Sequence, residues 1–129
     1  MSIEEGQTFR WERTFTERDV EEFARLSGDR GEHHLQGDEQ GRILVHGLLT
    51  ATLPTKIGGD LNYIARTMVF EFLRPVFVGD TIRVDAVATE VHPEGDHLAV
   101  AVHFECHNQD GKKVLEGSSH GIIRSRPQP

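Results

Sequence analysis

The sequence has 129 residues, which is enough for one domain with a single hydrophobic core. Its formal net charge of −7 argues against a nucleic-acid partner, because binding to a phosphate backbone needs a concentrated basic surface. No apolar run approaches the roughly 20 residues of a membrane span, the N-terminus lacks a signal-peptide pattern, and the lone Cys106 fits a reducing compartment, so we expect a cytoplasmic protein that contacts no membrane.

The N-terminal part predicts a short strand and then a capped helix. Residues 7–11 favour the strand. Thr16 is a good helix N-cap with Asp19 three positions later, and Phe15 and Val20 occupy the two positions of a hydrophobic staple. Gly28 stands where a helix of this length ends. The polar, glycine-rich stretch 36–41 is typical of a loop.

A second helix is predicted from about Gly47 to Ile57, and it is apolar on nearly all sides. A helix with so little polar surface is usually buried. Pro54 removes one backbone hydrogen bond from its interior and is expected to kink it. The glycine pair at 58–59 is expected to end it.

The chain after Tyr63 alternates between apolar and polar residues, as strands do. Turn-forming residues separate the alternating runs at 78–80, 93–96 and 108–111. The last strand is expected from about Lys112 to Ile123, and residues 124–129 are expected to form a flexible tail. These features together predict a single α+β domain over residues 1–129, in which an antiparallel sheet wraps around one central apolar helix.

Two neighbouring stretches carry the candidate chemistry. Asp29 and His34 lie five positions apart in a loop with glycines at 28 and 31, and a carboxylate and an imidazole held around one water can deprotonate it. His46 and Gly47 open the apolar helix, whose first backbone N–H groups lack internal partners and can bind an oxyanion. Equally, the Asp and His are compatible with solvated turn residues, and Gly47 with simple relief of crowding at a turn that His46 caps.

Three segments of the chain resemble the MaoC-like branch of the hotdog fold, the family of (R)-specific enoyl-CoA hydratases. They are the segment from Phe15 to Asp29, the run Val45-His46-Gly47-Leu48-Leu49, and the run from Phe72 to Asp80 (FLRPVFVGD). Asp29 and His34 keep the spacing of the family's catalytic Asp and His. The family's intervening Asn-Pro is replaced here by Gly31 and Glu32, and the segment 35–44 is shortened.

The resemblance implies an enzyme that interconverts a trans-2-enoyl-CoA and an (R)-3-hydroxyacyl-CoA without metal or other cofactor, and that works as a homodimer through edge-to-edge strand pairing. It implies Asp29 as the base, His34 as the group that positions the water, and the helix start at His46, Gly47 and Leu48 as the oxyanion and substrate-binding element. Two alternatives stay open: a hotdog acyl-CoA thioesterase, and a non-catalytic acyl-CoA-binding or partner subunit.

The remaining polar residues do not predict a second site. His103 and His107 share one face of a strand, but four residues separate them by about 13 Å, which is too far for one metal ion. Cys106 has the parity of the apolar residues of its strand and is predicted to be a core residue. Asp80 is expected in a turn, and Arg74 on the surface.

Overall fold

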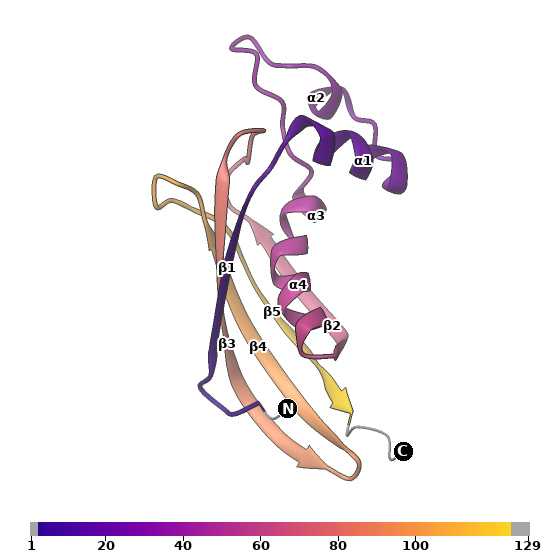
Figure 1. Cartoon of the computed structure of the whole chain (residues 1–129), viewed down its shortest axis with the longest axis vertical. Helices are drawn as coiled ribbons and strands as arrows, with labels where there is room; N and C mark the ends of the chain where they lie inside the picture. Colours follow the sequence, from indigo (N-terminus) through magenta and orange to yellow (C-terminus); the bar gives the residue numbers. More distant parts are fainter. Residues whose placement is uncertain (1–2, 125–129) are drawn as a thin grey trace.

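A curved antiparallel sheet of five strands forms one layer of the protein, and a helix lies along its concave face (Figure 1). The computed structural model describes residues 3–124. The strands follow the order β1-β3-β4-β5-β2 across the sheet, so β1 and β2 form its two edges. Their bounds are β1 Thr8–Thr14, β2 Tyr63–Phe72, β3 Thr81–Glu94, β4 His97–His107 and β5 Lys113–Arg124. The predicted α+β hotdog architecture is therefore confirmed.

Four helical segments stand outside the sheet: α1 Glu17–Ser27, α2 Glu32–Leu35, α3 Gly47–Thr50 and α4 Thr52–Asp60. Figure 1 shows α3 and α4 against the sheet, while α1 and α2 lie together at one end of the molecule. Among residues 3–124, no helix is both long and apolar enough to cross a membrane.

The predicted caps of the first helix are confirmed. The Thr16 hydroxyl accepts a hydrogen bond from the Asp19 backbone N–H at 3.1 Å, and the Asp19 carboxylate accepts one from the Thr16 backbone N–H at 2.9 Å. Gly28 ends the helix in the left-handed conformation, with φ 81°. The reciprocal cap fixes the start of α1, and Gly28 turns the chain into the loop that carries Asp29.

The central helix differs from its prediction in two respects. It divides at Ala51 into α3 and α4, one turn before Pro54, whose missing N–H leaves the Thr50 carbonyl without its helical donor. It also continues through both glycines to Asp60 instead of ending at them. Its buried residues, Leu49, Leu53 and Ile57 among them, face the sheet, but Leu48 is 60% exposed, so the helix is not buried on all sides.

Strand β2 is an edge strand that exposes most of its side chains. Apolar residues make up much of this exposed surface: Ile64, Met68, Val69 and Phe72. On its other side β2 pairs with β5, and Gly117 and Gly121 of β5 allow that close approach. A long, apolar strand edge without a partner is unusual in a soluble protein, since it is a template for pairing with another chain.

Both predicted terminal strands extend beyond their expected bounds. β1 continues from Trp11 to Thr14, where it pairs with β3 as far as Thr81. Arg124 belongs to β5 and pairs with His97, so it is not part of a tail. The rest of the expected tail, 125–129, lies outside the described residues.

We expect Gly121→Ala to lower the free energy of unfolding by about 1–3 kcal/mol, because overpacking forces the backbone to shift. A Cβ atom there would lie 2.2 Å from the Ile64 carbonyl oxygen, which cannot rotate away. Gly59→Ala is the matched control: nothing lies within 4 Å of that position in α4, and alanine stabilises a helix interior. Urea unfolding gives the free energy of unfolding of each variant. Equal changes in the two variants would contradict the predicted clash at Gly121.

Candidate active site

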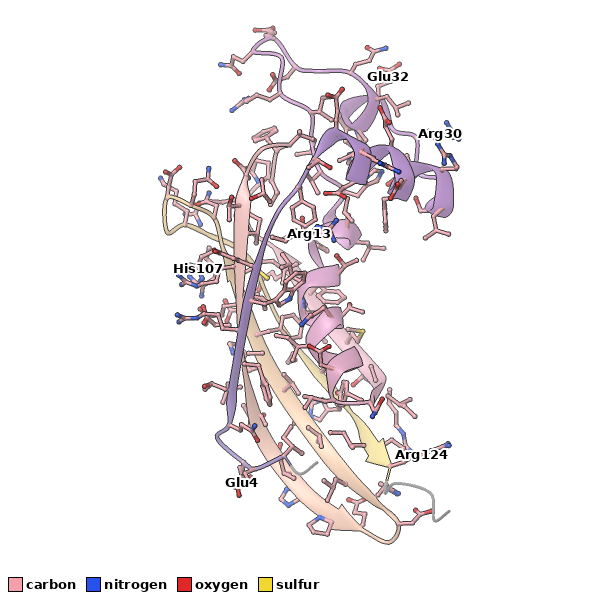
Figure 2. The ribbon with its side chains drawn as sticks, viewed as in Figure 1. Glu4, Arg13, Arg30, Glu32, His107 and Arg124 are labelled. Carbon is pink, nitrogen blue, oxygen red and sulfur yellow. The ribbon has the colours of Figure 1, made fainter. Side chains whose placement is uncertain are left out.

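The structure brings Asp29, in the loop after α1, together with His34 of the short helix α2. The Asp29 Oδ2 atom lies 3.8 Å from His34 Nε2. The Asp29 side chain is 55% exposed, whereas that of His34 is 5% exposed. The pair thus combines a carboxylate that solvent can reach with an imidazole that protein atoms hold in place. Arg30 of this loop and Glu32 of α2 lie at the outer end of the molecule (Figure 2).

Hydrogen bonds to carbonyl groups define the orientation of the His34 ring. His34 Nδ1 lies 2.7 Å from the carbonyl oxygen of Leu44. A carbonyl oxygen can only accept, so Nδ1 carries the hydrogen and Nε2 of the neutral ring presents a lone pair towards Asp29. Two acceptors at 3.8 Å cannot bond each other directly, but one water molecule can donate a hydrogen bond to each.

His46 contacts both members of this pair. It is 2% exposed, and its ring stacks on that of His34 with 3.7 Å between centroids and 17° between planes. Its Nε2 atom lies 2.9 Å from the backbone carbonyl oxygen of Asp29. His46 occupies the expected N-cap position of α3, although its side chain makes no cap hydrogen bond.

Gly47 and Leu48 begin α3 immediately after His46. Both residues are exposed, and within residues 3–124 neither backbone N–H has a hydrogen-bond acceptor. The expectation that Gly47 relieves crowding is supported, because a Cβ atom there would lie 2.9 Å from the Phe72 ring. The first N–H groups of a helix have no acceptor within the helix, so those of Gly47 and Leu48 are free to bind a ligand.

The Asp29 carboxyl is held in its ionised form. The Gly31 backbone N–H donates to Asp29 Oδ1 at 3.2 Å, and this hydrogen bond is the largest cause that lowers the pKa of Asp29 below its ordinary value. Partial desolvation opposes this shift. At neutral pH the group is therefore a carboxylate that can accept a hydrogen bond or a proton.

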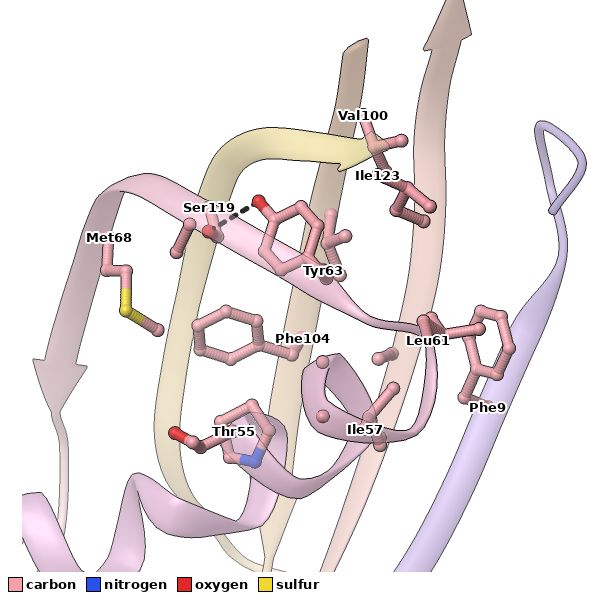
Figure 3. A pocket seen from close by; sticks show the side chains of 16 residues that line it. Phe9, Thr55, Ile57, Leu61, Tyr63, Met68, Val100, Phe104, Ser119 and Ile123 are labelled. Carbon is pink, nitrogen blue, oxygen red and sulfur yellow. Dashed lines mark hydrogen bonds between the residues drawn. The ribbon is translucent and has the colours of Figure 1, made fainter. Parts of the chain in front are cut away.

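A second feature is an apolar cavity of about 260 Å³ between α4 and the sheet (Figure 3). Ile57 and Gly58 of α4 form one side of it, while Phe104 and Val102 of β4 form another. Its polar groups include Tyr63 and Ser119, whose hydroxyl oxygens lie 2.7 Å apart. Ser119 also donates to the Thr67 carbonyl oxygen at 2.9 Å, so Tyr63 is the donor to Ser119. The cavity can therefore hold an apolar chain.

Two groups of side chains lie close enough to hold a metal ion within the described part of the chain, namely Asp29, His34 and His46, and His103, Glu105 and Glu116. In the first group, His34 Nδ1 and His46 Nε2 are already bonded to carbonyl oxygens. In the second, the Lys113 ammonium lies 3.0 Å from Glu116 and 3.5 Å from Glu105 and supplies a cation itself.

Three other residues occupy the places that the sequence predicts. Cys106 is completely buried, and burial raises the pKa of its thiol to about 12. Asp80 accepts hydrogen bonds from the Phe77 backbone N–H and the Gln109 side chain in a turn. Arg74 is exposed and donates to the Lys113 carbonyl oxygen at 2.7 Å.

Comparison with known proteins gives the same class of fold. The chain is 30% identical over 135 residues to an (R)-specific enoyl-CoA hydratase of Rhodospirillum rubrum, covering 96% of this chain and 90% of the relative. It is 25% identical to a mitochondrial 3-hydroxyacyl-[acyl-carrier-protein] dehydratase of Solanum lycopersicum, covering 93% and 77%. The R-hydratase PhaJ1 of Pseudomonas aeruginosa superposes with a TM-score of 0.84 at 27% identity, covering 97% and 84%. No protein-family model matches.

The fold and these relatives define a hotdog-fold protein of the hydratase and dehydratase class. Within that class, the chain belongs to the MaoC-like (R)-hydratase family.

Sequence reasoning missed two parts of the site. The contact of His46 with Asp29 joins residues 17 positions apart through a main-chain oxygen, which no side-chain motif records. The apolar cavity combines residues of α4 with residues of all five strands. Only the alternation of apolar residues in the strands indicates some of the residues that line the cavity.

We expect Cys106 to resist thiol reagents in the folded protein, because only the thiolate reacts and burial holds the thiol protonated. Ellman's reagent should react slowly at pH 8 and stoichiometrically once guanidinium chloride unfolds the chain. Fast reaction of the native protein would place Cys106 outside the core.

Proposed function

We propose that the protein hydrates a trans-2-enoyl thioester to the (R)-3-hydroxyacyl thioester and catalyses the reverse dehydration. The observation that carries this proposal is the pairing of the Asp29 carboxylate with the lone pair of His34 Nε2 at 3.8 Å. This geometry suits a single water molecule bound between two acceptors, with an oxygen lone pair left free to attack.

The proposed reaction moves protons and changes no net oxidation state. The water oxygen bonds to the β-carbon while its proton passes to the Asp29–His34 pair. The electron pair of the carbon–carbon double bond moves through the α-carbon to the thioester oxygen, and the α-carbon then takes up a proton from the pair. Such a cycle needs neither a redox cofactor nor a metal ion.

The start of α3 is the proposed oxyanion site. The negative charge that develops on the thioester oxygen needs hydrogen-bond donors that are already in place. The N–H groups of Gly47 and Leu48 meet this need, since they are exposed and unpaired among residues 3–124. His46 itself is buried, so its proposed part in this element is to carry Gly47 rather than to touch substrate.

The apolar cavity beside α4 is the proposed acyl site, and the substrate carrier is proposed to be CoA. A cavity of about 260 Å³ with mostly apolar walls matches an acyl chain better than a polar ligand. The net charge of −7 disfavours an acidic carrier protein as the routine partner. We place the activity in the cytoplasm, where an unpaired cysteine stays reduced.

We propose a homodimer in which β2 pairs antiparallel with β2 of a second copy. The exposed apolar edge of β2 supports this pairing, because a second copy would satisfy both its hydrogen bonds and its side chains. Phe72 at one end of β2 packs beside Gly47, whereas Tyr63 at the other end lines the cavity. Antiparallel pairing therefore sets the Asp29–His34 pair of one copy near the cavity of the other.

We expect Asp29→Asn to reduce crotonyl-CoA hydration by about 10²- to 10⁴-fold, the usual contribution of a general base. The substitution keeps the size of the side chain and removes the proton acceptor. Glu32→Gln is the matched control, because Glu32 is an exposed carboxylate of the same loop. Loss of enoyl absorbance measures the rate, and chiral analysis of the product gives its configuration.

The same assay separates the alternatives. Release of free CoA from the substrate would indicate a thioesterase. A wild-type protein that binds enoyl-CoA of several chain lengths but hydrates none of them would be a non-catalytic binding subunit. Unchanged hydration in Asp29→Asn would remove Asp29 as the base.

We expect Val69→Lys to dissociate the dimer, because it places a charge in the middle of the exposed face of β2, where Val69 is 62% exposed. The hydration rate should fall as the molar mass falls from that of a dimer to that of a monomer. Leu26→Lys on α1 is the control, since Leu26 is 86% exposed and lies outside the proposed interface. Light scattering after gel filtration gives the mass, and a Val69→Lys dimer would exclude β2 as the contact.

A further inference from the structure

His46 is a buried polar residue that takes no direct part in the proposed chemistry. It is 2% exposed, follows Val45 of the segment that enters α3, and cannot reach a bound substrate through the atoms that cover it. A buried imidazole is costly unless its polar atoms are used, so its contacts indicate its purpose.

The His46 ring contacts α1 and the two segments that carry the Asp29–His34 pair, namely the loop after α1 and α2. Its Nε2 atom donates to the Asp29 carbonyl oxygen at 2.9 Å, which makes the neutral ring an Nε2–H tautomer. One face of the ring stacks on His34 at 3.7 Å, and Phe23 of α1 packs against the ring at 4.8 Å. Its Nδ1 atom is buried and has no hydrogen-bond partner among residues 3–124.

The loop itself offers Asp29 little support. The other hydrogen bonds of Asp29 are local, to Ser27 Oγ through its backbone N–H and to the Gly31 N–H through its carboxylate. Gly28 and Gly31 on either side add conformational freedom to the chain. In contrast, the segment of His46 is tied to the body of the protein, because the Val45 N–H donates to the Val76 carbonyl oxygen at 2.8 Å.

We propose that His46 is the positioning residue of the Asp29–His34 pair. One imidazole holds both members at once: its N–H group fixes the main chain of Asp29, and its face fixes the plane of His34. The distance from Asp29 Oδ2 to His34 Nε2, and with it the place of the attacking water, then depends on His46. This inference rests on the proposed hydratase function and assigns to His46 a role in kcat rather than in substrate binding.

Two substitutions separate the hydrogen bond from the stacking. His46→Phe keeps an aromatic ring against His34 but loses the donor to Asp29, whereas His46→Gln keeps an N–H donor of similar reach and loses the ring. We expect His46→Phe to lower kcat by about 10- to 100-fold, as small displacements of reacting groups do, with KM little changed. His46→Gln should recover part of this loss, since it restores the bond to Asp29.

His33→Ala is the matched control. The His33 ring also packs on His34, at 4.0 Å, but it is exposed and forms no hydrogen bond to Asp29 in the described residues. Its loss should leave kcat within about two-fold of the wild type. Thermal unfolding of each variant identifies any effect that comes only from lost stability.

A second measurement does not depend on activity. Imidazole ¹⁵N spectra of the wild type should show Nε2–H for His46 and Nδ1–H for His34, and His46→Phe should change the His34 pattern. If the wild type hydrates no enoyl-CoA, the proposed function fails while these spectra still test the arrangement. The inference is overturned by His46→Phe with kcat near the wild-type value, by an equal loss in folded His46→Gln, or by a His46 ring protonated at Nδ1 alone.

Discussion

The packing of one short apolar helix into a curved sheet is the constraint on which the rest of the structure depends. Leu53 of α4 is completely buried among residues of the strands, such as Ile82 and Leu115. Two hydrogen bonds fix the path of this helix: Val45 to Val76 just before it begins, and the Trp11 indole to the Leu53 carbonyl oxygen, at 2.7 Å, within it. The start and the middle of the helix are thus held against the rest of the protein, and each end of the helix lies beside a different part of the candidate site.

Helices and strands whose bounds depend on nearby residues could be predicted from the sequence. The bounds of α1 follow from Thr16, Asp19 and Gly28, since each acts on backbone groups within a few residues. The exposure of β2 could not be predicted in this way. Its alternation of Met68, Phe70 and Phe72 is typical of a strand that buries one face, but burial depends on which element covers that face, and no described element covers it completely.

The same division applies to the candidate site. The pairing of Asp29 and His34 was predicted from the family resemblance. Their spacing beside glycines allows the contact but is equally compatible with solvated turn residues. The sequence assigned His46 to the substrate, and the structure instead buries it against Asp29 and His34. Every residue has a main-chain carbonyl oxygen, so a hydrogen bond to that atom requires no particular residue type. Such a bond therefore cannot be predicted from sequence patterns.

The Asp29–His34 pair and the apolar cavity lie apart in one copy of the protein, and this separation bears on the role of the exposed edge of β2. The Asp29–His34 pair lies at the start of α3, and the cavity lies along the second half of α4. Residues 47–60 would extend over about 20 Å as a continuous helix, so one copy holds these two parts at opposite ends. The proposed acyl thioester substrate would place its double bond at the Asp29–His34 pair and its chain in the cavity. In the proposed homodimer, antiparallel pairing of β2 would reverse the helix direction and bring the two ends together, so this proposal would account for both the apolar edge and the divided site.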